Sequence, residues 1–470
     1  MTSAFINRLV TGVPGLDTIL GGGLPEFSFN LITGAPGSGK TTLAHQIMFN
    51  LATPDRPALF FTVLGEPPIK MLRYQQQFSF FDVEKINKSV HFLNLSTEMN
   101  SGDFDQVLAR VVKEVNDRSA GLVFVDSFRS VSSISHRKSE GESQLQQFIQ
   151  SLGSFLTGWQ ATTFLVGEYE GTDSGANPIF TVADGIFMLN QAVEQNSTVR
   201  KIRVWKMRGQ AVVNGLHSFR ISNSGIEVFP RLLSQPRPED PARQTVGPIR
   251  GRLSMGSPEL DAMMGGGLPM GHSMLVSGPS GSGKSTLAAM FLAAGARAGE
   301  KGLLATFERN SSQASHAEIN RLVADRSISV IETPGLDVSL DETLHELTLA
   351  IAADGATRVV IDSLSGLELA LDPHFRLDFR EAVYRIVAGL TAAGASVIIT
   401  TEADQHCTHP PTAPHTTSFL TDSMIMQRHV EVDGRLERQL AVVKMRNSAH
   451  SGAVRAYRIT DAGIEITPRS

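Results

Sequence analysis

The sequence predicts an α/β fold that is built twice: two tandem domains, each a mostly parallel twisted sheet flanked by helices. Two observations predict it. Short apolar runs rich in β-branched residues alternate with amphipathic helical patterns, and long segments of the first half of the chain return in the same order in the second half. Because consecutive parallel strands need a crossover connection, usually a helix, this alternation is typical of doubly wound α/β domains.

Individual elements follow from local patterns. The runs at 59–63, 122–125 and 162–166 are almost continuously apolar, which is the pattern of strands buried on both faces of a parallel sheet. Residues 104–116 instead repeat apolar side chains with a helical period. We expect this segment to form a crossover helix that covers the sheet.

The internal repeat is the most informative large-scale feature. Gly15–Pro25, which ends in Gly-Gly-Gly-Leu-Pro, returns as Glu259–Pro269. Val204–Arg208 returns as Val442–Arg446, with Lys-Met-Arg in both copies. A period of more than 200 residues is too long for a solenoid and indicates a duplicated domain.

The repeat also sets the expected boundaries. We expect an N-terminal domain at 1–231, a linker at 232–250 and a C-terminal domain at 251–470. The linker contains Pro236, Pro238 and Pro241. Proline interrupts helix and ladder hydrogen bonds, so this segment is expected to be a stiff connection rather than a further element.

Composition narrows the function classes. The 470-residue chain is 41% hydrophobic and 19% charged, as in a globular protein. Its net charge of −5 argues against a protein whose main task is gripping nucleic acid, which needs a basic face. The single cysteine, Cys407, cannot form an intrachain disulfide. Neither a signal peptide nor a membrane span is evident, so we expect a cytoplasmic protein.

The strongest motif is the phosphate-binding pattern G-x-x-x-x-G-K-[ST], found at Gly34–Thr41 and again at Gly278–Ser285. Each copy follows an apolar strand and begins a helix, which is the context the motif requires. The glycines let backbone N–H groups surround a phosphate, and the lysine reaches the β- and γ-phosphates of ATP. The residues expected to bind nucleotide are Gly37, Ser38, Gly39, Lys40, Thr41, Thr42, Gly281, Ser282, Gly283, Lys284, Ser285 and Thr286.

Carboxylates that could serve a metal ion follow two other strands. Asp126 ends the run at 122–125 and Asp362 ends the run at 359–361. In open α/β sheets, ligands bind at the carboxyl ends of the strands. We therefore expect Mg²⁺ to be held by Thr41 with Asp126 and by Ser285 with Asp362.

Hydrolysis also needs a base or a residue that orients water. Glu66 and Glu308 follow the second strand of each copy and are the candidates, alongside the loop lysines Lys40 and Lys284. A solvated loop glutamate is the alternative for each. Glu168 and Glu402 follow the next strand and could sense the γ-phosphate.

One cation pair lies near the end of each copy. Lys206 and Arg208, like Lys444 and Arg446, are two residues apart on a strand and so leave from one face. They could contact the phosphates bound by a neighbouring subunit, which would require a ring; a solvated strand face is the alternative. His406, Cys407 and His409 fit no standard zinc spacing, and we interpret them as part of a proline-rich surface loop.

These motifs together resemble the KaiC family of circadian-clock ATPases over nearly the whole chain. The resemblance rests on the duplicated Gly-Gly-Gly-Leu-Pro segment, the paired phosphate loops, the two Asp-Ser pairs and the Lys-Met-Arg segments. It implies tandem RecA-like P-loop NTPase domains in a double-ringed homohexamer with ATP between subunits. It also implies slow ATP hydrolysis in the N-terminal ring and serine/threonine autokinase activity in the C-terminal ring.

The resemblance assigns further residues. The Lys-x-Arg pairs would reach across the interface to the neighbour's ATP, and Ser448 and His450 match nucleotide-contacting positions of the second domain. Of the family's adjacent glutamates, Glu308 occupies the first position, used as base, whereas Glu66 occupies only the second. The phosphorylation sites fall at Ser418-Phe419, so the acceptor candidates are Ser418, Thr417 and Thr421.

The resemblance also bears on partners. The chain ends at Ser470 without the extended tail that docks a KaiA-type activator, so we do not expect such an activator. A KaiB-like protein or a histidine-kinase-type signalling protein is the partner expected instead.

Three functional hypotheses remain open on the sequence. The leading one is a hexameric KaiC-like ATPase that autophosphorylates and acts as a signalling or timing switch. The second is a RecA/DnaB-like nucleic-acid motor, which would need basic loops facing a channel; the segment 130–138 offers Arg137 and Lys138 but little else. The third is a non-catalytic scaffold that ATP holds together.

Overall fold

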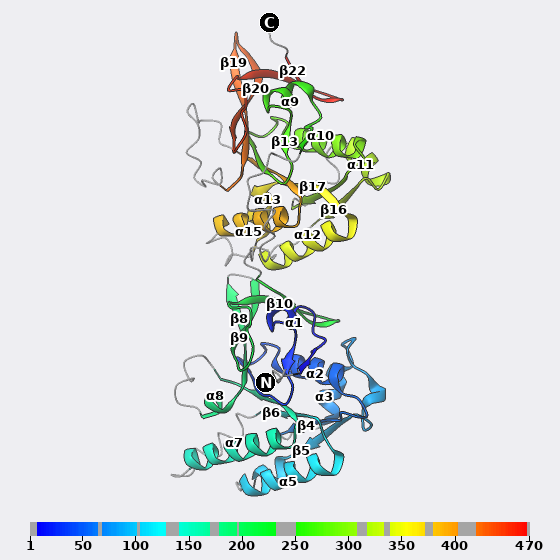
Figure 1. Cartoon of the computed structure of the whole chain (residues 1–470), viewed down its shortest axis with the longest axis vertical. Coiled ribbons are helices and arrows are strands. Elements are labelled where there is room, and N and C mark those ends of the chain that lie inside the picture. Colours follow the sequence, from blue (N-terminus) through cyan, green and yellow to red (C-terminus); the bar gives the residue numbers. More distant parts are fainter. Residues whose placement is uncertain are drawn as a thin grey trace, which may run out of the picture. The chain divides into compact units, whose positions relative to one another are not determined.

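The computed structural model of the chain describes residues 7–63, 68–100, 104–127, 141–169, 178–194, 197–231, 251–307, 317–332, 339–371, 379–402 and 420–467. The chain divides into two compact units, Met1–Leu232 and Leu233–Ser470 (Figure 1). Each unit contains one nine-stranded sheet and a two-stranded ribbon near its start. The predicted α/β fold class, repeated twice, is confirmed.

The sheet of unit one has the strand order β11-β10-β9-β8-β3-β7-β6-β4-β5. The six strands from β8 to β5 pair in parallel, and β9, β10 and β11 extend that sheet in antiparallel fashion. The strands are β1 (Arg8–Leu9), β2 (Leu24–Pro25), β3 (Phe29–Gly34), β4 (Ala58–Thr62), β5 (Val90–Asn94), β6 (Leu122–Asp126), β7 (Thr162–Gly167), β8 (Gly185–Glu194), β9 (Ser197–Met207), β10 (His217–Ser222) and β11 (Gly225–Phe229).

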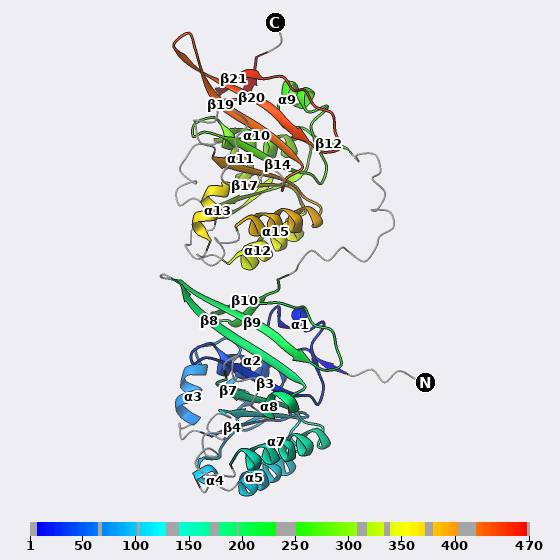
Figure 2. The ribbon, with the colours of Figure 1, turned by 90° about the vertical axis from the view of Figure 1, so that its left-hand side faces the viewer.

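Helices cover both faces of this sheet. Figure 2 shows α5 and α7 side by side on one side of it and α2 on the other. The helices are α1 (Leu16–Ile19), α2 (Lys40–Leu51), α3 (Pro68–Gln75), α4 (Ser96–Asn100), α5 (Phe104–Arg118), α7 (Gly141–Gly158) and α8 (Pro178–Val182), with a 3₁₀ turn at Val83–Lys85.

Unit two repeats the arrangement, with the order β16-β15-β17-β18-β14-β19-β20-β21-β22. Its strands are β12 (Arg252–Leu253), β13 (Leu268–Pro269), β14 (Ser273–Gly278), β15 (Lys301–Thr306), β16 (Ile328–Glu332), β17 (Ala356–Asp362), β18 (Ser396–Glu402), β19 (Ser423–Val432), β20 (Arg435–Met445), β21 (Arg455–Thr460) and β22 (Gly463–Ile466). Its helices are α9 (Pro258–Met263), α10 (Lys284–Arg297), α11 (Ala317–Ala324), α12 (Leu340–Asp354), α13 (Leu364–Ala370) and α15 (Phe379–Ala392).

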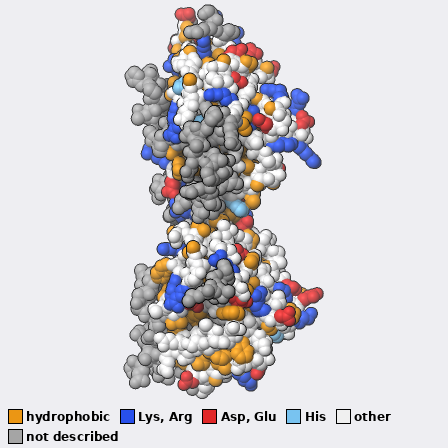
Figure 3. Space-filling view, viewed as in Figure 1, with side chains coloured by type: hydrophobic (Ala, Val, Ile, Leu, Met, Phe, Trp, Pro, Cys, Tyr) orange, Lys and Arg blue, Asp and Glu red, His pale blue; other side chains and the backbone are white. Residues whose placement is uncertain are grey.

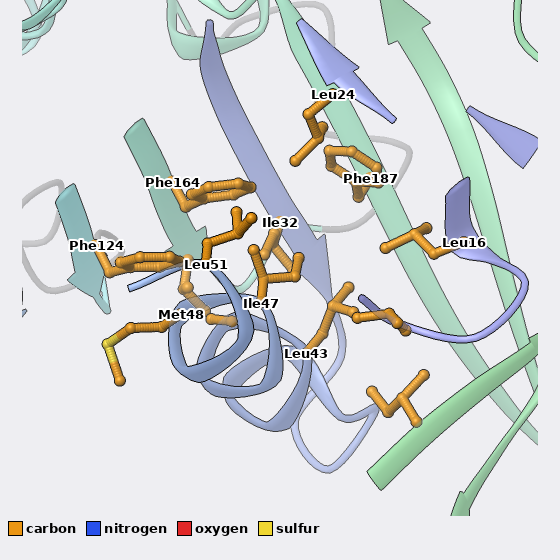
Figure 4. Close-up of a cluster of buried hydrophobic side chains, with 14 of the residues drawn as sticks. Leu16, Leu24, Ile32, Leu43, Ile47, Met48, Leu51, Phe124, Phe164 and Phe187 are labelled. Carbon is orange, nitrogen blue, oxygen red and sulfur yellow. The ribbon is translucent and has the colours of Figure 1, made fainter. Parts of the chain in front are cut away.

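The core explains why the central strands are apolar on both faces. In unit one, α2 packs against the aromatic side chains of neighbouring strands (Figure 4). The Phe124 and Phe164 rings stack with centroids 4.8 Å apart. Leu31 and Leu165 point to the opposite face, into the cluster shared with α5 and α7. The two clusters together hold β3 rigidly between two helical layers, which fixes the position of the loop that follows it.

The two units differ where α2 and α10 meet the last strand. In unit one the Gln46 amide donates to the Ile226 carbonyl at 3.1 Å and accepts from its N–H at 2.7 Å. In unit two the Ile464 N–H instead donates to the Met290 sulfur at 3.0 Å. The buried backbone groups are satisfied in both cases, by different chemistry. None of the described helices is long and apolar enough to cross a membrane.

Buried His45 gives unit one a predicted pH dependence. The imidazole is fully buried beside Phe60, and burial lowers its pKa to about 4, a shift that the Gln75 side chain partly opposes. Below an unfolded-state pKa of about 6.5, protons therefore bind the unfolded chain preferentially. The contribution of neutral His45 is fully present above pH ~6.5 and is lost as pH falls toward 4, by at most about 3 kcal/mol.

We expect His45→Leu to flatten this fall in the free energy of unfolding. Both tryptophans, Trp159 and Trp205, lie in unit one, so urea titrations followed by tryptophan fluorescence at pH 7, 6 and 5 report on this unit alone. Gln46→Leu, a neighbouring change without a titrating group, serves as the control and should shift stability equally at each pH. Equal pH slopes for His45→Leu and the parent chain would contradict the prediction.

Candidate functional site

The phosphate loop of unit one connects β3 to α2. Its glycines adopt backbone conformations that side chains disfavour, with φ of 77° at Gly37 and 100° at Gly39. A Cβ added to Gly39 would lie 2.8 Å from the Ile221 side chain, so both space and backbone conformation require glycine there. α2 begins immediately afterwards, which directs its N-terminal N–H groups into the loop, as phosphate binding requires.

Each loop lysine is buried and reaches back across its own loop. Lys40 is 7% exposed, and its Nζ donates to the Ala35 carbonyl at 2.8 Å. Lys284 is 9% exposed and donates to the Gly278 and Pro279 carbonyls at 2.9 and 3.0 Å. The ammonium of each therefore lies over the concave side of the loop, where phosphate oxygens of a nucleotide would meet it.

Electrostatics at Lys40 identify nearby acids. Burial lowers the pKa of Lys40, and the carboxylates of Glu168 and Asp126 oppose that shift. Glu168 follows β7 and Asp126 ends β6, so both lie at the carboxyl edge of the sheet beside the loop. Glu168 and Asp126 therefore lie near the Lys40 ammonium in unit one.

The candidate Mg²⁺ ligands meet in unit one. The Thr41 hydroxyl donates to an Asp126 carboxylate oxygen at 2.7 Å. In unit two the Asp362 carboxylate instead accepts from Thr400 at 2.5 Å. The difference has a local cause, because Val166 occupies the position of Thr400 in β7 and carries no hydroxyl.

These oxygen donors fit Mg²⁺, which prefers hard oxygen ligands and keeps most of its waters. Within the described residues, no group of three or more His, Cys, Asp or Glu side chains could hold a metal ion. The arrangement therefore suits an ion held by one hydroxyl, one carboxylate, water molecules and the phosphates of a nucleotide, rather than by protein ligands alone.

The Lys-x-Arg pair of unit one lies at the other end of the strands from the phosphate loop, at the sheet edge where β3 and β8 begin. Met207 pairs with Gly185, and Gly185 pairs with Asn30 at the start of β3. Asn30 precedes Gly34 by four residues, or about 13 Å of strand. The pair at Lys206 and Arg208 is therefore well separated from the phosphate loop of its own unit.

Local contacts hold this pair in place. Lys206 Nζ donates to the Phe180 and Thr181 carbonyls, both at 3.1 Å. Arg208 donates to the Thr181 carbonyl at 3.2 Å and forms an ion pair with Asp184 at 3.2 Å. Burial lowers the pKa of Lys206, and the adjacent Arg208 lowers it further. A cavity of about 470 Å³ opens beside Arg208 and Asp184.

Unit two places its Lys-x-Arg pair beside the equivalent aspartate, although the lysine contacts a different carbonyl. Lys444 Nζ donates to the Thr421 carbonyl at 2.6 Å, and Arg446 lies 3.7 Å from Asp422. Burial, followed by the charge of Arg446, lowers the pKa of Lys444. The Thr421 side chain is 1% exposed. This predicted acceptor thus lies at the Lys-x-Arg edge and not beside the phosphate loop of its own unit.

The other two predicted nucleotide contacts of unit two also lie at this edge. Ser448 accepts a hydrogen bond from Arg252 at 2.6 Å, and His450 is exposed. The structure therefore divides the predicted site residues of each unit into two groups on opposite edges of one sheet. The phosphate loop and the metal-side aspartate form one group, and the Lys-x-Arg segment forms the other.

Sequence reasoning missed several site residues. No site role was predicted for Asp184 or Asp422, although each precedes its Lys-x-Arg pair by the same interval in both copies. Their carboxylates accept from the N–H of Phe29 and of Ser273, both at 3.0 Å, and so tie the pair to the first core strand. Arg438 was also missed; its Nε donates to the Gly281 carbonyl of the second phosphate loop at 3.2 Å.

Several predicted residues lie outside the described part of the chain. They are the candidate bases Glu66 and Glu308, the candidate acceptors Thr417 and Ser418, the basic residues Arg137 and Lys138, and the segment around His406, Cys407 and His409.

Comparison with known proteins finds one family and its members over nearly the whole chain. The model of a family described as the KaiC ATPase matches residues 9–232 and 253–470. The chain is 28% identical over 484 residues to the circadian clock oscillator protein KaiC of Rippkaea orientalis, covering 99% of this chain and 89% of that protein. It is 27% identical over 482 residues to the protein of the same name from Picosynechococcus sp., covering 98% and 90%. It is 26% identical over 477 residues to the circadian clock oscillator protein KaiC 1 of Synechocystis sp., covering 98% and 89%.

The two phosphate loops predict two nucleotide sites per chain. Lys40→Ala and Lys284→Ala should each remove one site, because each buried ammonium serves only its own loop. Isothermal titration with a non-hydrolysable ATP analogue and Mg²⁺ should then give about one site per chain for either single variant and none for the double variant. Arg321→Ala, an exposed cation on α11, should leave the stoichiometry unchanged. Retention of both sites in either single variant would contradict the prediction.

Proposed function

The chain belongs to the KaiC family of ATPases, and from this premise we propose that it is a ring-forming ATP-driven switch that autophosphorylates in unit two. ATP hydrolysis is the activity of the family. The autokinase activity, the ring and the signalling or timing role are proposals for this chain. We also propose a KaiB-like or histidine-kinase-type signalling protein as its partner.

The observation that carries the proposal is the separation of each site into two edges. A lysine that serves a bound phosphate must come within a few ångströms of it. Lys206 and Arg208 end a strand at the edge opposite their own phosphate loop. Lys206 is partly buried, but the Arg208 side chain is 58% exposed, which suits contact with a nucleotide held by a second copy of the chain.

Such a contact joins different surfaces of two identical chains. A heterologous interface of this kind generates a closed ring when its rotation closes. Six copies is the number that the family resemblance implies. Each ATP would then lie between a phosphate loop and the neighbour's Lys-x-Arg pair, which would stabilise the negative charge of phosphoryl transfer.

The position of the acceptor segment beside the Lys-x-Arg pair supports autophosphorylation. Thr421 lies beside Lys444, and its carbonyl accepts from that ammonium; Ser418 and Thr417 precede it by a few residues. In the proposed reaction a hydroxyl oxygen of this segment forms a bond to the γ-phosphorus as the bond to the bridging oxygen of ADP breaks. The hydroxyl proton passes to the Glu308 carboxylate.

The proposed site would hold Mg²⁺ through Thr41 with Asp126 and through Ser285 with Asp362, and a bound ion would neutralise phosphate charge. Lys40 and Lys284 would orient the phosphates. The nucleic-acid motor is the less favoured alternative. On the face shown in Figure 3, basic and acidic side chains of the described residues are interspersed rather than segregated, and a motor channel would need a basic lining.

Mixing two inactive variants tests the shared site. Lys284→Ala removes the loop lysine and Lys444→Ala removes the contact to the neighbour, so each should lose the share of ATP turnover that unit two supplies. In an equimolar mixture reassembled with ATP, about one interface in four joins an intact loop to an intact Lys444. About a quarter of the lost turnover should therefore return. If no turnover returned, both residues would act within one chain, and the shared site would be wrong.

Labelled ATP tests the autokinase. With Mg²⁺ and γ-labelled ATP, we expect label on the chain at Ser418 or at a neighbouring hydroxyl, located by mass spectrometry, and its loss in Glu308→Gln. Glu332→Gln, which alters another glutamate in the described part of unit two, is the matched control and should keep the label. ADP release without label would leave an ATPase switch. If neither ADP nor label were formed, the result would support the nucleotide-held scaffold instead.

A further inference from the structure

The duplicated Gly-Gly-Gly turn has no part in the site described so far. In unit one it joins α1 to β2, and in unit two it joins α9 to β13. All three glycines have positive φ in both copies: 70°, 116° and 118° at Gly21–Gly23, and 68°, 109° and 109° at Gly265–Gly267. Three such residues in succession disfavour any other residue type.

Close backbone approach also requires glycine here. A Cβ added to Gly23 would lie 2.5 Å from the Leu9 carbonyl oxygen, and one added to Gly267 would lie 2.3 Å from the Leu253 carbonyl oxygen. On the other side, a Cβ on Gly21 would lie 2.8 Å from the Ala211 carbonyl oxygen. The turn is therefore clamped between the first strand of the unit and the segment that follows the Lys-x-Arg pair.

Hydrogen bonds attach the same segment in unit two. Arg252 donates to the Met264 and Gly267 carbonyls at 2.9 and 2.8 Å, and to the Ser448 hydroxyl at 2.6 Å. The Ser451 N–H donates to the Met263 carbonyl at 2.8 Å. One guanidinium thus joins the turn to the residue that lies two positions after Arg446.

Unit one makes the same connection with a different side chain. The Gln210 amide donates to the Leu20 and Gly23 carbonyls at 2.8 and 2.9 Å. The Val213 N–H donates to the Ile19 carbonyl at 2.8 Å. Gln210 occupies the repeat position of Ser448, and Arg8, at the position of Arg252, also donates to the turn at Gly21. The connection is present in both units although the residues that make it have changed.

We propose that the glycine turn, with Arg252 in unit two and Gln210 in unit one, is a positioning element for the Lys-x-Arg pair. The inference rests on the proposed function. Asp184 and Asp422, which directly precede the neighbouring strands β8 and β19, hold the arginine of the pair, and the turn holds the segment that follows the pair. Ordering a lysine or arginine side chain costs much rotamer freedom. Fixing the backbone on both sides of the pair favours a single orientation of these side chains toward a neighbour's phosphates.

Arg252→Met tests the element in the full-length chain. It keeps the length of the side chain but removes three donated hydrogen bonds. We expect the ATP turnover that unit two supplies, defined as the share lost in Lys284→Ala, to fall about ten- to a hundredfold at saturating ATP. The number of ATP-analogue sites per chain should stay unchanged, because Lys284 and its phosphate loop lie at the other end of the strands. Arg321→Met is the matched control and should change neither quantity. Unchanged turnover in Arg252→Met would overturn the inference.

A double-mutant cycle separates positioning from general loss of structure. If Arg252 acts through the pair, Arg252→Met should cost little further turnover in a Lys444→Ala/Arg446→Ala chain. The same fold-loss in both backgrounds would mean a purely structural role and would overturn the inference. If Lys444→Ala/Arg446→Ala itself left turnover unchanged, the proposed function would fail first. Loss with that variant but not with Arg252→Met would sink only the positioning role.

Unit one offers a rescue that does not depend on the fold of unit two. Gln210→Ser reproduces the serine of unit two while Arg8 remains available, so turnover should stay within about twofold of the parent chain. Two double variants, Gln210→Ser/Arg8→Met and Gln210→Leu/Arg8→Met, should each lose the share of turnover that unit one supplies. Equal turnover in all three variants would overturn the inference for unit one.

Discussion

The parallel pairing of β3 with β8 is the constraint on which the rest of the structure depends. A parallel pair has one edge where both strands begin and another where both end. The phosphate loop follows the end of β3, and Asp184, with the Lys-x-Arg pair, lies where β8 begins. Unit two repeats this with β14 and β19. The core layers on both faces of the sheet keep the two edges at a fixed separation, so neither group of residues can approach the other within one unit.

Much of the fold and part of the site could be predicted from local sequence. The phosphate loops are contiguous, and their glycines, lysine and hydroxyl act within eight residues of one another. Asp126 and Asp362 could be placed because the carboxyl end of a buried strand determines where they lie. The family resemblance predicted that the Lys-x-Arg pairs act away from their own phosphate loop, but local sequence alone could not place them, because their position depends on β9 and β20 running antiparallel to their neighbours. Periodicity does not reveal the direction of a strand.

Contacts made by side chains that lie far from any motif in sequence could not be predicted either. Arg358 is 2% exposed and holds Glu300 at 2.5 Å together with the Ser254 and Phe291 carbonyls. The sequence shows only an isolated arginine in an apolar strand. Arg438 and the aspartates that hold the Lys-x-Arg pairs were missed for the same reason. The duplication was the one signal that could have found them, since equal spacing in both copies marks positions that the fold uses twice.

A site divided between two chains makes activity a property of the assembly rather than of the molecule. In the proposed ring, an isolated copy holds nucleotide at one edge and offers its cations at the other, with neither completed. The output per copy then falls on dilution, because completed sites vanish as contacts dissociate. Expression level becomes an input to the proposed switch, because halving the supply of a partly dissociated ring removes more than half of its completed sites.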